Sequence, residues 1–299
     1  MREPQSDRDE AKSQVIGRAQ NPLNYESFLD VFKLIKERAW LDHRNESLVS
    51  LWNFCTDANE WELVRDLILL FDYINGNSLD TAYSNIMRHV LSTWAMKPGE
   101  TLFIAIADDA SPDGSQAVIQ GLKSKIPPAT SWGERHFLTR IQDLSDKKNL
   151  NEKTFILVED FLGTGDKLVE QLGKVKDLLG QLGVAAPKIR LVVVAAMERS
   201  REVLESSGIT YYCDRWLRRG ISDHRSAVEA AEAIKLMKGL ERRLQRMVNG
   251  QILPHLGYGK SESLVYLENI SIPNNVFPIF WWPNDANRKY RNPMFTRAR

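Results

Sequence analysis

The residues of this chain best suited to chemistry are two adjacent carboxylates, Glu159 and Asp160, followed closely by a loop rich in glycine and threonine. Paired carboxylates suit the vicinal hydroxyl groups of a sugar or a hydrated divalent cation. The loop offers backbone N–H groups left accessible by glycine, a hydroxyl and an ammonium, all of which can bind phosphate. The candidate phosphate-binding residues are Gly163, Thr164, Gly165, Asp166 and Lys167. The pattern predicts a site for a phosphorylated sugar.

These residues lie between a predicted strand and a predicted helix. Residues 155–158 form an unbroken apolar run, typical of a central parallel strand buried on both faces. A helical pattern begins at Leu168, so the loop precedes a helix N-terminus, where N–H groups and the helix dipole favour an anion. Ligands of open α/β sheets bind at this carboxyl edge. The alternative is an ordinary strand–turn–helix junction with Asp166 as a cap.

At these residues the chain resembles type I phosphoribosyltransferases. The resemblance implies that Glu159 and Asp160 hold the ribose hydroxyls of phosphoribosyl pyrophosphate while the loop holds its 5-phosphate. It also implies Mg²⁺ as a cofactor, carried by the ligand rather than ligated directly by side chains. Two positions depart from the family, because many members have Thr or Ser in place of Gly163 and Thr in place of Lys167.

A second strand, loop and helix precede this motif and are expected at the same edge of the sheet. Residues 102–107 read as a buried strand, and a helix is expected from Gln116 to about Lys125. The intervening loop is acidic, so it would repel a pyrophosphate unless Mg²⁺ bridged the two. It is therefore either an anion site or a capped turn. Its candidate residues are Asp108, Asp109, Ser111 and Ser115.

The alternation of strands and helices predicts an α/β fold, a parallel-sheet phosphoribosyltransferase-like domain preceded by an all-α region. The expected divisions are a flexible N-terminus at 1–23, a helical domain at 24–97, the α/β domain at 98–283 and a basic tail at 284–299. Within the helical region, apolar residues at helical spacing over 61–74 predict one helix. Asn24 and Ser78 are expected to cap the first and last helices.

Composition excludes several classes of protein. The chain has 299 residues, 43% of them hydrophobic, and a formal net charge of +1, which argues against nucleic-acid binding by bulk electrostatics. Two cysteines, Cys55 and Cys213, are too few for a disulfide framework or a zinc site. No apolar run is long enough to span a bilayer, so a cytoplasmic protein without membrane contact is expected.

Two basic clusters are secondary candidates. Arg215 opens a polar run that ends near His224, and this run could contact a pyrophosphate or an acceptor or form a solvated loop. His224 has no partner that the sequence identifies, which weakens a general-base role. In the tail, Arg288 and Arg291 accompany aromatic residues. Such a combination could stack a base and pair with phosphates, or pack back as a C-terminal strap.

From about Asn24 onward the chain resembles a lineage of phosphoribosyltransferase-like proteins of bacterial conflict systems, including retron-linked effectors. The shared features are the acidic pair, the glycine loop and a tail with Pro273-Asn274-Asn275, then Phe280-Trp281-Trp282 and arginines. The resemblance implies an anti-phage defence effector, with a protein or nucleoprotein complex as a possible partner.

Three functions follow. The first is an enzyme that binds phosphoribosyl pyrophosphate or a related nucleotide and transfers or cleaves at the ribose anomeric carbon. The second is a catalytically inactive module of the same fold that senses a nucleotide or restrains a partner. The third is a different doubly wound fold that binds a nucleotide by the same loop physics.

Overall fold

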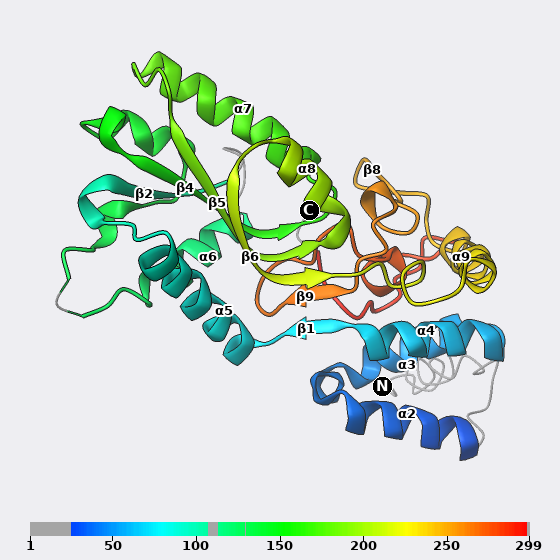
Figure 1. Ribbon diagram of the computed structural model, residues 1–299. Helices are drawn as coiled ribbons and strands as arrows, with labels where there is room; N and C mark the ends of the chain where they lie inside the picture. The colour runs from blue at the N-terminus through cyan, green and yellow to red at the C-terminus, as the bar shows by residue number, and fades with distance from the viewer. Residues whose placement is uncertain (1–24, 107–112, 129, 298–299) are drawn as a thin grey trace, which may run out of the picture.

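The central element of the structure, a computed structural model that describes residues 25–106, 113–128 and 130–297, is a five-stranded parallel sheet (Figure 1). Its strand order is β3-β2-β4-β5-β6, with β4 in the middle. This arrangement confirms the predicted α/β class. The strands are β2 (Thr101–Ala105), β3 (Phe137–Leu138), β4 (Thr154–Leu162), β5 (Lys188–Met197) and β6 (Thr210–Leu217).

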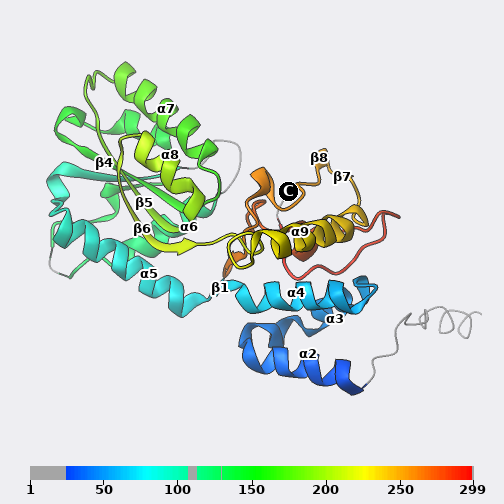
Figure 2. The same cartoon turned by 45° about the vertical axis from the view of Figure 1, so that its right-hand side comes forward.

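Alternate residues of the strands enter two separate hydrophobic cores, because successive side chains of a strand point to opposite faces. Ile156 and Val158 of β4 face the core that contains α5 (Gly76–Arg88) and α6 (Gly114–Lys123). Phe155 and Leu157 face the other core, with α7 (Asp166–Gln181) and α8 (Arg201–Ser206). Figure 2 shows α7 and α8 on one side of the sheet and α5 and α6 on the other. Burial on both faces explains why the strand sequences are continuously apolar.

The N-terminal region is helical, as predicted, but it contains one strand. Helices α2 (Tyr25–Glu37), α3 (Asn45–Phe54) and α4 (Ala58–Leu70) are followed by β1 (Asp72–Ile74). The single helix expected over 61–74 was therefore wrong over its last four residues, 71–74. Strand β1 pairs in parallel with β9 (Val265–Leu267), a partner so distant in the chain that no local pattern could show it.

The helix cap expected at Ser78 was also wrong. Helix α5 begins at Gly76, and the side chain of Asn75 accepts a hydrogen bond from Ser78 N at 2.9 Å. Asparagine is as good a cap as serine, and here it stands one turn earlier. The other expected cap, Asn24, lies outside the described residues.

The C-terminal part of the chain, after α9 (Ala227–Arg242), packs between the helical region and the sheet (Figures 1 and 2). It forms two very short strands, β7 (Met247–Val248) and β8 (Gln251–Ile252), before β9. The part from 253 to 297 is called the C-terminal segment below. Its phenylalanine and tryptophan side chains are almost completely buried, so they belong to the core: Phe277, Phe280, Trp281, Trp282 and Phe295. Of the two alternatives stated above for the aromatic residues of the tail, the burial supports a C-terminal strap that packs back on the protein.

Residues 130–152 form a series of short turns and one short strand. They form 3₁₀ turns at Glu134–His136, Ile141–Asp146 and Leu150–Glu152, together with strand β3. Strand β3 pairs with β2 and is one of the two edge strands of the sheet. Across the part of the chain that the structure covers, no helix has the length and apolar character needed to cross a bilayer.

Candidate functional site

The two adjacent acids lie inside the carboxyl-terminal half of β4 rather than after its end. Glu159 is 3% exposed and Asp160 is 8% exposed. Glu159 is in register with Val193 of β5, so the sheet holds the backbone of the pair on a rigid central strand.

A third carboxylate, Asp113, joins this pair. Carboxylate oxygens of Asp113, Glu159 and Asp160 lie within 4.8 Å of one another, and these three residues are called the acid cluster below. Asp113 is the N-cap of α6 and accepts a hydrogen bond from Ser115 N at 3.2 Å. A Cβ at Gly114 would lie 2.0 Å from Asp160 Oδ2, so glycine is what lets α6 begin against the acids.

The residues that the sequence predicted to be functional in this second loop were other than Asp113. Asp108, Asp109 and Ser111 lie outside the described residues. Ser115 is fully buried, and its Oγ has no hydrogen-bond partner among the residues that the structure covers. Asp113 was not among the candidates, because the sequence does not show that α6 starts beside β4.

Burial and mutual repulsion control the charges of the acid cluster. Burial raises the pKa of Glu159 well above its usual value, and the charge of Asp160 raises it further. Burial also raises the pKa of Asp160. Glu159 therefore keeps its proton to a higher pH than an exposed glutamate does. The pair is suited to binding hydroxyl groups, since one carboxyl can donate while the other accepts.

Lys167 provides a nearby positive charge. Its Nζ lies 2.5 Å from Asp113 Oδ2. Burial lowers the pKa of Lys167, but the charges of Glu159, Asp113 and Asp160 raise it by more, so the ammonium stays protonated. The lysine that departs from the family pattern thus connects the loop to the acid cluster.

The loop of residues 163–167, called the phosphate loop below, connects β4 to the first turn of α7. Gly165 has φ of +89°, a conformation that favours glycine, and α7 begins at the next residue. Within the described part of the chain, no group accepts a hydrogen bond from the backbone N–H of Gly163, Thr164 or Gly165. Unpaired N–H groups at the start of a 16-residue helix favour an anion such as phosphate.

The C-terminal segment forms one wall of this loop, which the sequence did not reveal. A Cβ at Gly163 would lie 2.1 Å from Asn275 Nδ2, and one at Gly259 would lie 2.4 Å from Thr164 Cγ2. Asn275 is buried and donates a hydrogen bond to Ser261 Oγ at 2.8 Å. Gly163 is therefore needed for the approach of Asn275, in addition to any approach by a ligand.

The arginines proposed as secondary site residues have partners elsewhere. Arg215 lies within β6 and forms an ion pair with Asp72 of β1 at 2.5 Å. Arg288 is exposed. Arg291 is 8% exposed, and its guanidinium lies 4.0 Å from the centre of the Phe54 ring. Burial lowers the pKa of Arg291 to about 10. These positions support structural roles for Arg215 and Arg291.

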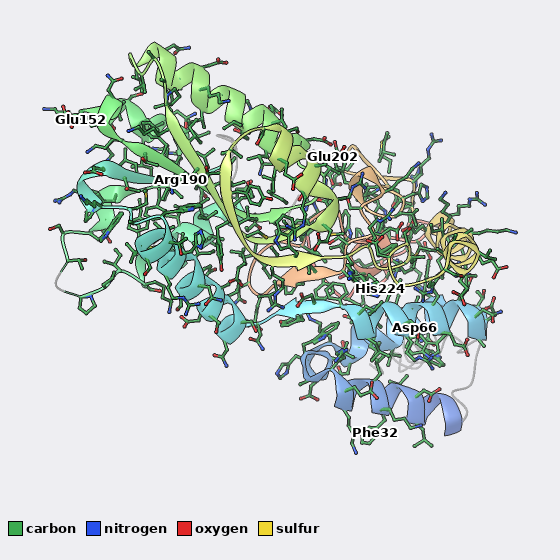
Figure 3. The ribbon with its side chains drawn as sticks, viewed as in Figure 1. Phe32, Asp66, Glu152, Arg190, Glu202 and His224 are labelled. Carbon is green, nitrogen blue, oxygen red and sulfur yellow. The ribbon has the colours of Figure 1, made fainter. Side chains whose placement is uncertain are left out.

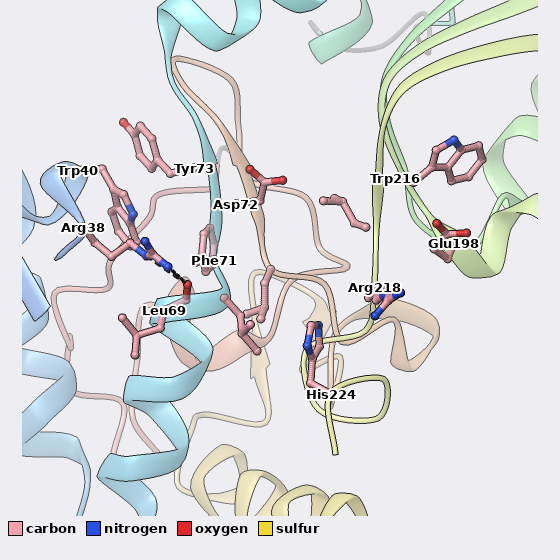
Figure 4. A pocket seen from close by; sticks show the side chains of 13 residues that line it. Arg38, Trp40, Leu69, Phe71, Asp72, Tyr73, Glu198, Trp216, Arg218 and His224 are labelled. Atoms are coloured by element: carbon pink, nitrogen blue, oxygen red, sulfur yellow. Dashed lines mark hydrogen bonds between the residues drawn. The ribbon is translucent and has the colours of Figure 1, made fainter. Parts of the chain in front are cut away.

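The polar run after β6 lines a different cavity, of about 540 Å³ (Figure 4). Arg218 and His224 face it from one side, while α4 and β1 form the other side. The loop is joined to α4 by an ion pair of 3.2 Å between Arg225 and Asp66. Figure 3 labels Asp66 on α4 and His224 in the loop. As far as the described residues go, its lining includes no member of the acid cluster or the phosphate loop. His224 is therefore not placed as a base for that site.

The residues at the acid cluster fit Mg²⁺ when a ligand shares its coordination. Carboxylate oxygens are suitable donors, and Mg²⁺ in proteins usually keeps waters and substrate phosphates as ligands. Lys167 already neutralises part of the charge of Asp113, which limits direct binding by side chains alone. The acid cluster fits a cation that arrives with a diphosphate.

Comparison with solved structures finds phosphoribosyltransferases of low sequence identity. Orotate phosphoribosyltransferase of Mycobacterium tuberculosis H37Rv in complex with inorganic phosphate is 13% identical, with a TM-score of 0.31 over 52% of this chain and 76% of that one. The same enzyme in complex with 5-phospho-alpha-D-ribosyl 1-diphosphate is 12% identical, with a TM-score of 0.31 over 52% of this chain and 79% of that one. Hypoxanthine-guanine phosphoribosyltransferase of Schistosoma mansoni in complex with IMP is 12% identical, with a TM-score of 0.30 over 48% and 65%.

No curated protein sequence matches the chain. The family model of PRTase-CE matches residues 51–297, which include the acid cluster, the phosphate loop and the whole C-terminal segment. A match over that length covers well more than half of the protein. With its parallel sheet and its phosphoribosyltransferase-type fold, the chain belongs to the PRTase-CE family.

Proposed function

We propose that this protein binds phosphoribosyl pyrophosphate, or a related nucleotide, and transfers or cleaves at the anomeric carbon of the ribose. The observation that carries the proposal is the position of the acid cluster beside the unpaired N–H groups of the phosphate loop. One element suits sugar hydroxyls and the other suits a phosphate, and both lie at the carboxyl edge of β4. A ribose 5-phosphate group has both features.

The chain's own residues would hold the ligand and stabilise charge. The phosphate loop binds the 5-phosphate through N–H groups and the dipole of α7. Glu159 and Asp160 bind the ribose hydroxyls and stabilise the positive charge that develops on the ring when the bond from the anomeric carbon to the diphosphate breaks. The diphosphate leaves with the bonding electrons, and an acceptor or water then bonds to that carbon. Mg²⁺, bound through the diphosphate, would neutralise the leaving group.

A substitution at Asp160 tests this proposal. The wild-type protein is incubated with Mg²⁺ and phosphoribosyl pyrophosphate, with and without nucleotide mixtures, and pyrophosphate release and ligand-induced thermal stabilisation are followed. Asp160→Asn is expected to abolish release. Asp177→Asn, the same change on an exposed part of α7, is expected to have no effect. The absence of both release and stabilisation in the wild type would refute the proposal.

A catalytically inactive sensor is the second candidate. It is favoured by the position of His224, which lines another cavity. Among the residues that the structure describes, the acid cluster consists of carboxylates alone. In that case phosphoribosyl pyrophosphate stabilises the protein without releasing pyrophosphate, and Asp160→Asn removes the stabilisation.

We also propose a role as a cytoplasmic anti-phage defence effector with a protein or nucleoprotein partner. The support is the resemblance of the tail to effectors of bacterial conflict systems. Plaque formation on bacteria that express the complete defence locus with wild type or Asp160→Asn provides the test. Equal plaque numbers with wild type and with an empty vector would refute the defence role.

A further inference from the structure

We propose that Arg297, near the end of the C-terminal segment, is an anion-binding residue of the same ligand site and contacts the diphosphate end of the ligand. This inference rests on the proposed function and adds a residue to it. Neither the glycine loop nor the acidic pair points to a residue so far along the chain.

The side chain of Arg297 is fixed in position by the C-terminal segment itself. Its Nη1 donates a hydrogen bond to the carbonyl oxygen of Ile272 at 2.5 Å, and its guanidinium lies 5.7 Å from the centre of the Trp281 ring. Trp281 is 2% exposed and belongs to the core. A guanidinium held on two sides is already oriented, so less side-chain entropy is lost when it binds a ligand.

One donor of this guanidinium has no partner. Arg297 Nε is buried and makes no hydrogen bond within the described residues. A buried N–H without an acceptor is uncommon and costs stability, which a ligand oxygen would relieve. Ser115 Oγ, at the start of α6, is a second buried group of this kind.

Contacts connect Arg297 to the acid cluster. Ile270, two residues before the Ile272 that binds Arg297, packs against Gly114: a Cβ at 114 would lie 2.9 Å from Ile270 Cγ2 and 2.0 Å from Asp160 Oδ2. The electrostatics agree with this placement, because burial lowers the pKa of Arg297 whereas Asp113 and Asp160 act to raise it. The guanidinium therefore lies near the acids on the α6 side.

With Arg297 in this position the site has two cationic regions, one for each phosphorylated end of the ligand. The phosphate loop with Lys167 lies at the start of α7 and takes the 5-phosphate, while the ribose lies at Glu159 and Asp160. The remaining anionic group of the proposed ligand is the diphosphate, and the second positive region is formed by Arg297 with the N-terminus of α6. Arginine is well suited to phosphate oxygens because its donors form a rigid fork.

The experiment compares two ligands that differ only in the diphosphate. Phosphoribosyl pyrophosphate and ribose 5-phosphate are titrated, each with Mg²⁺, into wild type, Arg297→Gln, Arg297→Lys and Arg288→Gln by calorimetry. Arg297→Gln is expected to weaken binding of phosphoribosyl pyrophosphate about 10- to 100-fold, the range for a hydrogen bond between charged groups, with little change for ribose 5-phosphate. Arg297→Lys keeps the charge without the fork and should fall between the two. Arg288→Gln removes an exposed tail arginine and should bind as wild type does.

The outcomes separate this inference from the proposed function. Wild-type binding of both ligands with unchanged affinity in Arg297→Gln would overturn the role of Arg297 and leave the proposed function standing. Tighter binding in Arg297→Gln, or an equal loss for both ligands, would also overturn it, because Arg297 would then be a structural counter-ion of the acids. A wild type that binds neither ligand overturns both. Thermal midpoints identify misfolded variants, and if Arg297→Gln does not fold, Arg297→Lys gives the result.

Discussion

Replacing the buried Glu159 with glutamine should make the free protein more stable at neutral and alkaline pH. Burial and the charge of Asp160 raise the pKa of Glu159 above the usual 4.5. An acid with a raised pKa in the folded state binds its proton more tightly when folded. Folding stability therefore falls as the pH rises from about 4.5 through the raised pKa, by at most about 1.4 kcal/mol per pH unit. Glu159→Gln removes this loss.

The assay is urea unfolding of wild type and Glu159→Gln between pH 5 and 8, without divalent cations. The free energy of unfolding of the variant should increase relative to that of the wild type as the pH rises. Mg²⁺ with ligand should reduce this difference, because the cation compensates the charge of Glu159. Glu152→Gln, an exposed carboxylate (Figure 3), should follow the wild type throughout. Parallel pH profiles for wild type and Glu159→Gln, or a variant that is less stable at pH 8, would refute the reasoning.

Three further substitutions test individual contacts. Gly163→Ala places a Cβ 2.1 Å from Asn275 Nδ2 and should cost about 1–3 kcal/mol by overpacking, measured by urea unfolding; Asn275→Ala in the same chain should restore most of it. Gly165→Val should abolish ligand binding in calorimetry and lower the thermal midpoint, because φ is +89° and the new Cβ would lie 2.9 Å from Val203 Cγ1; unchanged affinity would count against the phosphate loop. Arg291→Ala should lower the free energy of unfolding by about 2 kcal/mol or more through lost packing and a lost hydrogen bond, while ligand affinity stays at the wild-type value.

The fold class was predictable because its signals are local. The strand runs at 155–158 and 102–107 are apolar on both faces, and their order with the intervening helices determines a parallel sheet. What the sequence could not show depends on pairing between distant segments. Strand β1 reads as the end of a helix until β9 is placed beside it, and the aromatic tail reads equally well as a ligand platform until it is seen to be core.

Some residues of the candidate site were likewise predictable from the local sequence, and others were not. Glu159, Asp160 and the phosphate loop occupy one short stretch, so their residue types and spacing were enough to propose them. Asp113, Asn275 and Arg297 reach the site through the packing of α6 and of the C-terminal segment against β4, which residue spacing does not encode. Arg215 and Arg291 have the right charge for a phosphate site, but ion pairing and burial give them other partners.

The parallel pairing of β1 with β9 has a consequence for biosynthesis. While a ribosome adds about 5–20 residues each second, β1 waits with an unpaired edge until Val265–Leu267 has emerged, many seconds later. Asn275, whose side chain packs against Gly163 of the phosphate loop, is translated later still. A nascent chain that has not yet reached Asn275 would therefore carry both acids and the phosphate loop without the side chain that packs against Gly163.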